Sequence, residues 1–377
     1  MDNLKTILTR GVEQVLPTKE ALLERLSQGP IKLYLGIDPT GPLHLGHLSV
    51  LLKIRDFQQA GHETVILLGD FTATIGDPSD KTSTRKVLTP EEVENNLKDY
   101  KEQIVKVLDK DKTIFRRNSE WLSKMTTFEL ITLTTKVTIQ QTLKRDMFRR
   151  RQEEGKDIHM NEFLYPILQG YDSVVLGVDL EVGGNDQLFN MLAGRDLAKK
   201  ISGKDKFVLT GKLLVDPIGK KMGKTDGNFV GMSDSPHDIL GKIMSWPDTL
   251  MPLGFEILTR IPEEEYQNIL KGHPKEAKLT LAEEVVKLIY GADEAKKARQ
   301  EFGLTPENIE TVTVEEGTKL VEALLTAGLI ESKSEFRRLV EQGGVNLNDN
   351  KITDPDALVA EGRVKVGPLR FLNITLE

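Results

Sequence analysis

The tetrapeptide His44-Leu-Gly-His47 has the residue types and spacing to bind phosphate groups. It lies where a predicted strand turns into a predicted helix, so backbone N–H groups and the positive helix end point at a bound anion. The two imidazoles share one helix face, and Gly46 leaves room for a flat group such as adenine. The motif indicates a polyphosphate cradle. A pair of ordinary helix histidines is the alternative, and a metal site lacks an obvious carboxylate partner at ligand spacing.

A second candidate for phosphate chemistry is Lys221-Met-Gly-Lys-Thr225, within a long, polar, glycine-rich loop predicted over 216–228. Two lysines on such a loop can close on a transferring phosphate and stabilise charge that develops only in the transition state. Alone, this segment is better explained as a solvated basic loop. The occurrence of both motifs in one chain, in this order, favours phosphate chemistry.

The elements that must position these motifs form an α/β pattern. We predict a strand over 31–37, a helix over 44–60 and another strand over 64–68. Strand, loop, helix and strand in this order begin a parallel sheet. A second pattern of this kind has predicted helices over 163–168 and 190–200 and predicted strands over 180–184, 207–210 and 213–215.

The rest of the chain is predicted to be mostly helical before a distinct tail. The charged stretch from about 90 to 160 has a helical pattern, with a helix start at Pro90. Amphipathic helices are expected from about 235 to 310. The tail should form a small domain with helices over 320–325 and 334–340, followed by short strands.

Length and composition exclude several classes of protein. The 377 residues suit two or three domains. The absence of cysteine rules out disulfide frameworks, thiolate zinc sites and cysteine nucleophiles, and suits a reducing, cytoplasmic location. No uncharged apolar run approaches the roughly 18 residues that cross a bilayer, and the N-terminal stretch lacks the apolar core of a signal peptide. A net charge of −7 argues against a nonspecific DNA binder but permits a local basic patch.

Together the motifs resemble those of class I aminoacyl-tRNA synthetases, and specifically the bacterial type of the tyrosyl-tRNA synthetase family. Four further segments match that family in order: Tyr34-Leu-Gly-Ile-Asp-Pro-Thr40, Gly76-Asp-Pro-Ser79, Tyr165-Pro-Ile-Leu-Gln-Gly-Tyr-Asp172 and Gly183-Gly-Asn-Asp-Gln187. The resemblance covers nearly the whole chain. Two departures stand out: the lysine loop has Gly223-Lys-Thr225 where a serine is common, and Leu188 stands where one bacterial branch has tryptophan. The second departure suggests the other bacterial branch.

The resemblance implies the fold class and the domain boundaries. We expect an α/β protein whose Rossmann-like nucleotide-binding catalytic domain, with a parallel sheet, spans 1–232 and contains an inserted connective region at about 95–190. An α-helical anticodon-binding domain would follow over 233–312. A small α+β RNA-binding domain, similar to one in the ribosomal small-subunit protein S-four, would span 313–377. The resemblance also implies a homodimer, and neither a membrane nor DNA as a partner.

The activity implied by the resemblance has two steps. Tyrosine and ATP give tyrosyl-adenylate and pyrophosphate, and tyrosine then passes to the 3′-terminal ribose of tRNA(Tyr). The attacking carboxylate is already an anion, so the protein contributes positioning and charge stabilisation rather than a general base. Mg²⁺ is expected to arrive with ATP and to be held by phosphate oxygens more than by protein, so no protein-bound metal is predicted.

The resemblance also assigns site residues. Phosphate contacts and charge stabilisation fall to Thr40, His44, His47, Lys81, Arg85, Lys221 and Lys224. The ATP site includes Gly46, His47, Gly184, Asp186, Lys221, Met222 and Lys224. The tyrosine site comprises Tyr34, Gly36, Asp38, Thr72, Asp77, Tyr165, Gln169, Asp172 and Gln187.

Within the tyrosine site, Tyr34 and Asp172 would meet at the substrate hydroxyl. A phenylalanine substrate would leave both unpaired, at a large energetic cost. The resemblance places Asp77, Tyr165 and Gln169 at the ammonium group and Gln187 near the carboxylate. For Tyr165, core packing is the alternative, but Gln169 one turn later on the same face favours a functional role.

Two clusters of basic side chains are candidates for contacts with tRNA phosphates. One lies on a predicted helix and the other on the predicted helix of the small C-terminal domain: Lys144, Arg145, Arg149, Arg150 and Arg151, then Lys333, Arg337 and Arg338. A solvated helix face is the alternative for the first cluster.

Three other functions fit these motifs less well. A tryptophan-specific relative would not need the Tyr34 and Asp172 pair. A smaller nucleotidyltransferase acting on a metabolite would generally lack the lysine loop and the RNA-binding tail. A non-catalytic RNA-binding protein would have no use for both histidines and both loop lysines.

Overall fold

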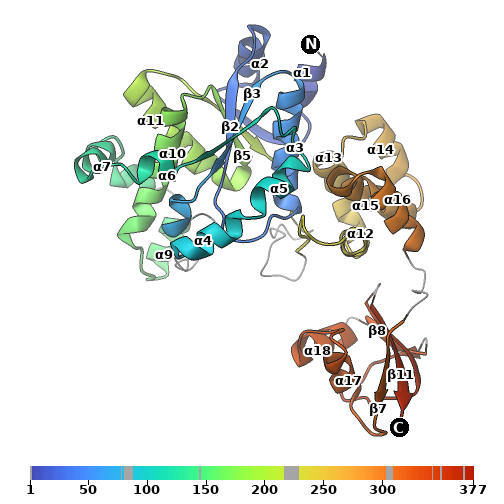
Figure 1. Ribbon diagram of the computed structural model, residues 1–377. Helices are drawn as coiled ribbons and strands as arrows, with labels where there is room; N and C mark the ends of the chain where they lie inside the picture. Colours follow the sequence, from blue (N-terminus) through green and yellow to red (C-terminus); the bar gives the residue numbers. More distant parts are fainter. Residues whose placement is uncertain are drawn as a thin grey trace. The chain divides into compact units, whose positions relative to one another are not determined.

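The computed structural model describes residues 2–77, 79, 88–143, 146–215, 229–302, 309–341, 343–348, 350–367 and 370–377. The chain divides into two compact units, Met1–Asp234 with Pro247–Ala277, and Ser235–Trp246 with Lys278–Glu377. The first unit is built on a largely parallel sheet and the second combines helices with a small sheet (Figure 1). The predicted α/β class is therefore confirmed.

A six-stranded sheet forms the centre of the first unit, in the order β1-β6-β5-β2-β3-β4. The strands are β1 Val12–Leu16, β2 Lys32–Ile37, β3 Glu63–Leu68, β4 Thr113–Arg117, β5 Leu180–Gly184 and β6 Phe207–Gly211. Only β1 pairs antiparallel, with β6; the other pairs are parallel. The strands predicted around 31–37, 64–68, 180–184 and 207–210 are present. Residues 213–215 form no strand of this sheet, so that prediction was wrong.

The two edge strands were not predicted from the sequence. β4 lies within a charged stretch, and most of its five side chains, Thr-Ile-Phe-Arg-Arg, are partly exposed. The stretch therefore lacks the apolar run that marks a central strand. β1 is short and also partly exposed. Edge strands need less apolar sequence than central ones because one side faces water or loops.

Figure 1 shows the helices of the first unit, some beside this sheet and others farther from it. They are α1 Asp2–Ile7, α2 Lys19–Ser27, α3 Leu45–Gln59, α4 Pro90–Leu97, α5 Tyr100–Val105, α6 Ser119–Leu122, α7 Thr127–Thr134, α8 Ile139–Leu143, α9 Asp146–Glu153, α10 Met160–Leu176, α11 Leu188–Ser202, α13 Met251–Leu258 and α14 Glu263–Leu270. The predicted helix start at Pro90 is correct: Thr89 and Glu92 form a capping box around it.

Helices α10 and α11 pack closely because glycines face each other across the contact. A Cβ built on Gly170 would lie 2.7 Å from Leu197 Cδ1 and 3.1 Å from the Cα of Gly194. Both positions therefore need glycine for the helices to approach this far. Helix α10 carries Tyr165 and Asp172, so this packing determines where those side chains lie relative to the carboxyl ends of the strands.

The second unit contains helices α12 Pro236–Met244, most of α15 Pro274–Tyr290, and α16 Ala292–Glu301. Its five-stranded sheet has the order β7-β11-β10-β8-β9, with strands β7 Thr311–Val314, β8 Val345–Leu347, β9 Asn350–Lys351, β10 Gly362–Val366 and β11 Arg370–Leu376. Helices α17 Leu320–Thr326 and α18 Lys333–Glu341 cover a core that includes Phe336, Val364 and Leu372. The two helices and the short strands predicted for the tail are present.

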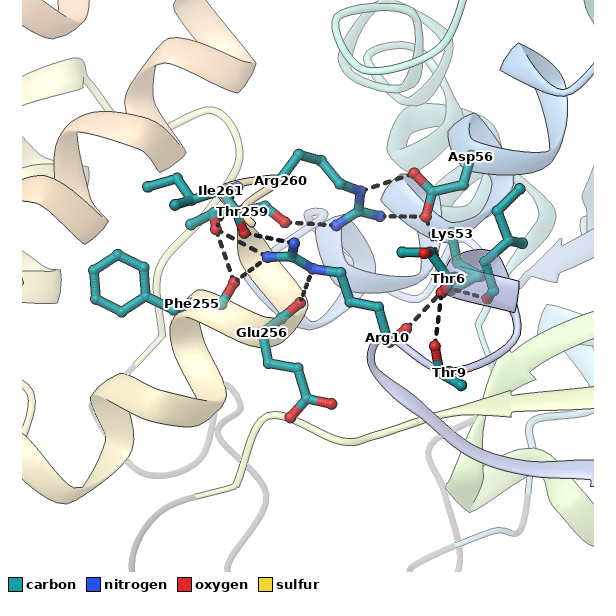
Figure 2. A network of polar contacts seen from close by, with 11 residues as sticks. Thr6, Thr9, Arg10, Lys53, Asp56, Phe255, Glu256, Thr259, Arg260 and Ile261 are labelled. Carbon is teal, nitrogen blue, oxygen red and sulfur yellow. Dashed lines mark hydrogen bonds and ion pairs between the residues drawn. The ribbon is translucent and has the colours of Figure 1, made fainter. Parts of the chain in front are cut away.

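A polar network joins the segment 247–277 to the N-terminal residues and α3 (Figure 2). Arg10 donates to the backbone carbonyls of Phe255, Glu256 and Ile261 at 2.9, 2.9 and 2.6 Å. Arg260 donates to both carboxylate oxygens of Asp56 at 2.8 Å. Lys53, which is 4% exposed, donates to the carbonyls of Ile7 and Arg10 and lies 3.6 Å from Asp56. The segment 247–277 is thus anchored to α3, the helix at whose start His44-Leu-Gly-His47 lies.

This network predicts a rise in stability at alkaline pH. Burial lowers the pKa of Lys53 from 10.5 to about 8, although Asp56 raises it. Below pH 8 both states carry the proton and the folded state bears the cost of the buried charge. Between the folded and unfolded pKa values the unfolded state binds more protons, so the free energy of unfolding should rise with pH, by at most about 3 kcal/mol. Lys53→Met should remove this rise in urea unfolding measured from pH 8 to 10.5. Lys5→Met, at an exposed lysine of α1, should keep it; equal slopes in both variants would contradict the assignment.

Candidate active site

A pocket of about 260 Å³ lies at the carboxyl ends of the parallel strands β2, β3 and β5. In open α/β sheets ligands bind at this edge, where the loops after the strands diverge. The predicted site residues that line the pocket are Tyr34, Gly36, Asp38, Thr40, His44, Gly46, His47, Thr72, Asp77, Tyr165, Gln169, Asp172, Gly184, Asp186 and Gln187. The fold therefore gathers residues that are far apart in the sequence around one cavity.

One end of the pocket holds Tyr34 and Asp172, both almost fully buried. Asp172 Oδ1 accepts from Trp121 Nε1 at 2.8 Å, and Oδ2 accepts from Asn118 Nδ2 at 3.1 Å. Burial raises the pKa of Asp172 well above its usual range, whereas these two hydrogen bonds lower it. Since N–H donors occupy both oxygens, the side chain is held as an acceptor. The Tyr34 hydroxyl shares a hydrogen bond of 2.9 Å with Ser173 Oγ, and burial raises its pKa, so it stays protonated.

Asp38 connects three elements around the middle of the pocket. Its Oδ1 accepts from Thr72 Oγ1 at 2.7 Å and its Oδ2 accepts from the Tyr165 hydroxyl at 2.8 Å. A Cβ on Gly69 would lie 2.0 Å from Asp38 Oδ1, so glycine is required beside this carboxylate. The Tyr165 hydroxyl thus donates to a carboxylate that lines the same pocket, so Tyr165 does more than pack in the core.

Two further groups face the cavity near the ends of β3 and β5. Gln187 Nε2 donates to Asp77 Oδ2 at 2.8 Å, and Asp77 Oδ1 also accepts from the backbone N–H of Ser79. Gln169 Nε2 donates to Glu181 Oε1 at 3.4 Å. Within the described part of the chain, Gln169 Oε1 is buried without a hydrogen-bond partner. A buried carbonyl oxygen of this kind suits a bound cation such as an ammonium group.

The two histidines form the start of α3. His44 Nδ1 accepts from the N–H of Gly46 at 3.1 Å, and His47 Nδ1 accepts from the N–H of His44 at 3.2 Å. A neutral imidazole whose Nδ1 accepts carries its proton on Nε2. A Cβ on Gly46 would lie 2.8 Å from the His44 ring, so glycine is needed for this arrangement. The helix start thus presents two ring N–H donors and its own positive end to the pocket.

The loop between β2 and α3 is fixed by helices α4 and α5. Thr40 N–H donates to the Asp38 carbonyl at 2.8 Å, and Asn96 Nδ2 donates to the Pro39 carbonyl at 2.7 Å. The Tyr100 hydroxyl donates to the Gly41 carbonyl. Helices α4 and α5 therefore help to hold the loop that carries Thr40. The other predicted phosphate contacts, Lys81, Arg85, Lys221, Met222 and Lys224, lie outside the described residues.

Sequence reasoning missed several residues of this pocket. Asn118, Glu181 and Lys212 also line it, and Trp121 and Ser173 contact residues that do. Asn118 directly follows β4 and Trp121 lies three residues later, on α6, so recognising that strand would have placed both near the carboxyl ends of the strands. Glu181 carried a signal of its own, a charged residue inside an otherwise apolar strand.

The basic side chains predicted to contact tRNA differ in their exposure. Arg149 and Arg150 are exposed on α9, and Lys333, Arg337 and Arg338 are exposed on α18. Arg151 is only 1% exposed and donates to Glu162 at 2.5 and 3.0 Å and to the Asp157 carbonyl. The expectation that Arg151 lies with its neighbours on a phosphate-binding face was therefore wrong, because this ion pair draws it inward. Lys144 and Arg145 lie outside the described residues.

Two kinds of feature are absent from the described ranges. In that part of the chain no group of three or more His, Asp or Glu side chains could hold a metal ion. Nor does any described helix combine the length and apolar character that crossing a membrane requires.

Two family models and several curated relatives match nearly the whole length of this chain. The family model for class I tRNA synthetases (W and Y) matches residues 26–304, and one for the tyrosine–tRNA ligase SYY-like C-terminal domain matches 301–365. A tyrosine–tRNA ligase of Moorella thermoacetica is 41% identical and covers 98% of this chain and 94% of its own length. One of Thermotoga maritima is also 41% identical, with 98% and 96% covered.

Solved structures agree on the fold. The tyrosyl-tRNA synthetase from Archaeoglobus fulgidus complexed with L-tyrosine superimposes with a TM-score of 0.63 at 24% identity, covering 79% of this chain and 99% of that one. A C-terminally truncated mitochondrial tyrosyl-tRNA synthetase from Aspergillus nidulans gives 0.68 at 22% identity, covering 79% and 92%.

Proposed function

This chain belongs to the class I tRNA synthetases of the tryptophan and tyrosine group, and on that premise we propose how its pocket performs the tyrosine–tRNA ligase reaction. Like the rest of its family, it is a ligase that activates an amino acid with ATP and transfers it to tRNA. Its full-length relatives are tyrosine–tRNA ligases. One observation supports tyrosine most strongly: the buried Tyr34 and Asp172 lie in the same cavity as His44 and His47.

In the proposed complex, the phenol of tyrosine occupies the end of the pocket with Tyr34 and Asp172. Its O–H donates to Asp172, whose two oxygens are acceptors. Tryptophan would bring an indole N–H and no oxygen to accept from Tyr34, so the pair favours tyrosine. The ammonium group is received by Gln169 Oε1, together with Tyr165 and Asp77, and Gln187 lies towards the carboxylate.

For the first step, a carboxylate oxygen of tyrosine attacks the α-phosphorus of ATP, and the bond to the β-phosphate breaks. Pyrophosphate leaves with its electron pair, so no proton needs to move. His44 and His47 donate Nε2–H groups to the phosphates at the positive end of α3, with Thr40 beside them. The family resemblance further assigns four cationic residues to stabilising the negative charge of the phosphates: Lys81, Arg85, Lys221 and Lys224. It assigns Gly46, Gly184, Asp186 and Met222 to contacts with the adenosine.

In the second step the terminal ribose hydroxyl of tRNA attacks the tyrosyl carbonyl carbon, its proton passes to a phosphate oxygen of the adenylate, and the bond between the carbonyl carbon and AMP breaks. We propose that Mg²⁺ accompanies ATP and neutralises phosphate charge, with its ligands drawn mainly from phosphate oxygens and water. Because the reaction consumes tRNA and ATP, we also propose a cytoplasmic location.

We propose that the domains divide this work as their boundaries suggest: catalysis over 1–232, anticodon binding over 233–312 and RNA binding over 313–377. For tRNA contacts we retain Arg149, Arg150, Lys333, Arg337 and Arg338, with Lys144 and Arg145 from the undescribed part of the first cluster. Arg151 is left out because its guanidinium is buried against Glu162.

Removing charge from α18 should weaken tRNA charging without affecting amino-acid activation. Arg337→Gln with Arg338→Gln removes two exposed cations, so the slope of log affinity against log salt should fall by about 1 to 2. The measurement is tRNA aminoacylation at several salt concentrations, beside pyrophosphate exchange. Lys110→Gln with Lys112→Gln removes the same charge from an exposed turn before β4 and serves as the control. An unchanged salt slope in the α18 variant would contradict its role.

A homodimer is also proposed, with a second copy of this chain as the partner. Large apolar side chains on α7, α8 and the start of α10 are between 59% and 79% exposed: Phe128, Ile131, Ile139 and Met160. An interface with a second copy of this chain would remove these side chains from water. Sedimentation equilibrium of the full chain tests this directly: twice the chain mass supports the dimer and a single chain mass overturns it.

A further inference from the structure

A buried ion pair lies behind the tyrosine end of the pocket. Lys206, just before β6, and Glu181, on β5, are 0% and 3% exposed, and Lys206 Nζ donates to Glu181 Oε2. Lys206 Nζ also donates to Ser173 Oγ at 2.7 Å and lies 5.9 Å from the centre of the Tyr34 ring. None of the pocket chemistry described above uses these charges. Buried pairs are weak contributors to stability, so their presence calls for another reason.

The fold makes space for this pair. A Cβ on Gly194 of α11 would lie 2.9 Å from Lys206 Nζ and 3.1 Å from Ser173 Oγ. Glycine at this position therefore admits the ammonium group between α10, α11 and the sheet. An apolar core would have filled the same space at lower cost.

The pair controls the direction of the hydrogen bonds that reach Tyr34. An ammonium group only donates, so Ser173 Oγ must accept from Lys206 and has one proton left to give. Its possible acceptors are the Tyr34 oxygen at 2.9 Å and Glu181 Oε2 at 3.3 Å, and the shorter contact favours Tyr34. A Tyr34 oxygen that accepts from Ser173 keeps its own proton for another acceptor, either Glu181 or a phenol oxygen bound in the pocket.

The same carboxylate orients the group at the other end of the substrate. Glu181 Oε1 can only accept, so Gln169 must present its NH₂ to it. The carbonyl oxygen of Gln169 is then left facing other partners, consistent with its buried and unpaired state among the described residues. One ion pair thus determines which atom of Tyr34 and which atom of Gln169 remains available for a hydrogen bond to the substrate.

We propose that Lys206, Glu181 and Ser173 are positioning residues that fix Tyr34 as a donor to the substrate phenol oxygen and Gln169 as an acceptor for the substrate ammonium group. The hydrogen bonds then run in one direction, from Lys206 through Ser173 and Tyr34 to the substrate, and from the substrate O–H to Asp172. This inference rests on the proposed function. It makes selection of tyrosine over phenylalanine depend on residues that never touch the substrate.

Ser173→Ala tests the relay with little risk to folding, since alanine is a better helix former than serine. Without Ser173 the Tyr34 hydroxyl turns to Glu181, the other acceptor close enough to raise its pKa. We expect kcat/KM for tyrosine in pyrophosphate exchange to fall about tenfold, with the value for phenylalanine and the KM for ATP within about twofold. Ser202→Ala, which removes a hydroxyl bonded only within α11, should change neither amino acid.

A second variant, Lys206→Met with Glu181→Gln, removes both charges together and avoids an unpaired buried ion. It should lower the ratio of tyrosine to phenylalanine kcat/KM as Ser173→Ala does. It should also raise KM for both amino acids, because Gln169 is no longer held as an acceptor for the ammonium group that both share. An unchanged ratio in Ser173→Ala, or an equal loss for both amino acids, would overturn the relay. Failure of the unaltered protein to show tyrosine-dependent exchange would instead overturn the proposed function, so the two failures are distinguishable.

Discussion

Asp172→Asn should abolish most of the preference for tyrosine. In the substituted side chain one of the two acceptor oxygens becomes an NH₂ group, which faces the N–H donor of either Trp121 or Asn118. The substrate phenol also loses one of the two oxygens that can accept its hydrogen bond. We expect kcat/KM for tyrosine to fall by about 10² to 10³, the equivalent of about 3 to 4 kcal/mol, while the value for phenylalanine changes little. Pyrophosphate exchange with each amino acid measures both.

Asp70→Asn is a matched control for this substitution. Like Asp172, Asp70 is a hydrogen-bond acceptor on both carboxylate oxygens. Its three donors are the backbone N–H groups of Phe71 and Ser119 and the Ser119 hydroxyl, and it does not line the pocket. It should leave the ratio between the two amino acids unchanged. If Asp172→Asn reduced activity with tyrosine and phenylalanine equally, the carboxylate would have a structural role and not a selective one.

His44→Ala should slow adenylate formation far more than it weakens tyrosine binding. The imidazole donates to phosphate oxygens whose charge grows as pyrophosphate departs, so its loss is felt mainly in the transition state. We expect the rate of the first step to fall by about 10² to 10³, with the Kd for tyrosine changed by less than about threefold. Stopped-flow measurement of adenylate formation separates these two quantities. His47→Ala should behave in the same way.

The loss of a helix cap must be separated from this effect. His44 caps α3, so its removal should also cost about 1 kcal/mol of stability. Thr18→Ala removes the side-chain cap of α2, away from the pocket, and should give a similar stability loss with a normal first step. A collapse of tyrosine affinity in His44→Ala would show that the assigned phosphate role is wrong.

The sequence was sufficient to place the parallel core of the first unit. The apolar runs that form β2 and β3 and the helical spacing of α3 are local signals, and the order of elements then places the loops at one edge. The pattern alone therefore placed His44 where a strand turns into a helix, whereas the site role of Asp38 came from the family resemblance. The roles of individual residues rested on the family resemblance.

Features that depend on distant partners were not predictable. β4 becomes a strand only by pairing with β3, so Asn118 and Trp121, which hold Asp172, were missed. Arg151 looks like part of an exposed basic face, and only its ion pair with Glu162 reveals that it is buried. The position of Lys206 beside Ser173 likewise depends on the packing of α11 against α10, which leaves no local signal in the sequence.

Amino-acid-dependent exchange of pyrophosphate into ATP, measured on the purified protein with all the standard amino acids in parallel, tests the central claim most directly. The geometry of Tyr34 and Asp172 and the phosphate donors of α3 predict rapid exchange with tyrosine and far slower exchange with phenylalanine or tryptophan. Absence of exchange with tyrosine, or faster exchange with tryptophan, would contradict the account.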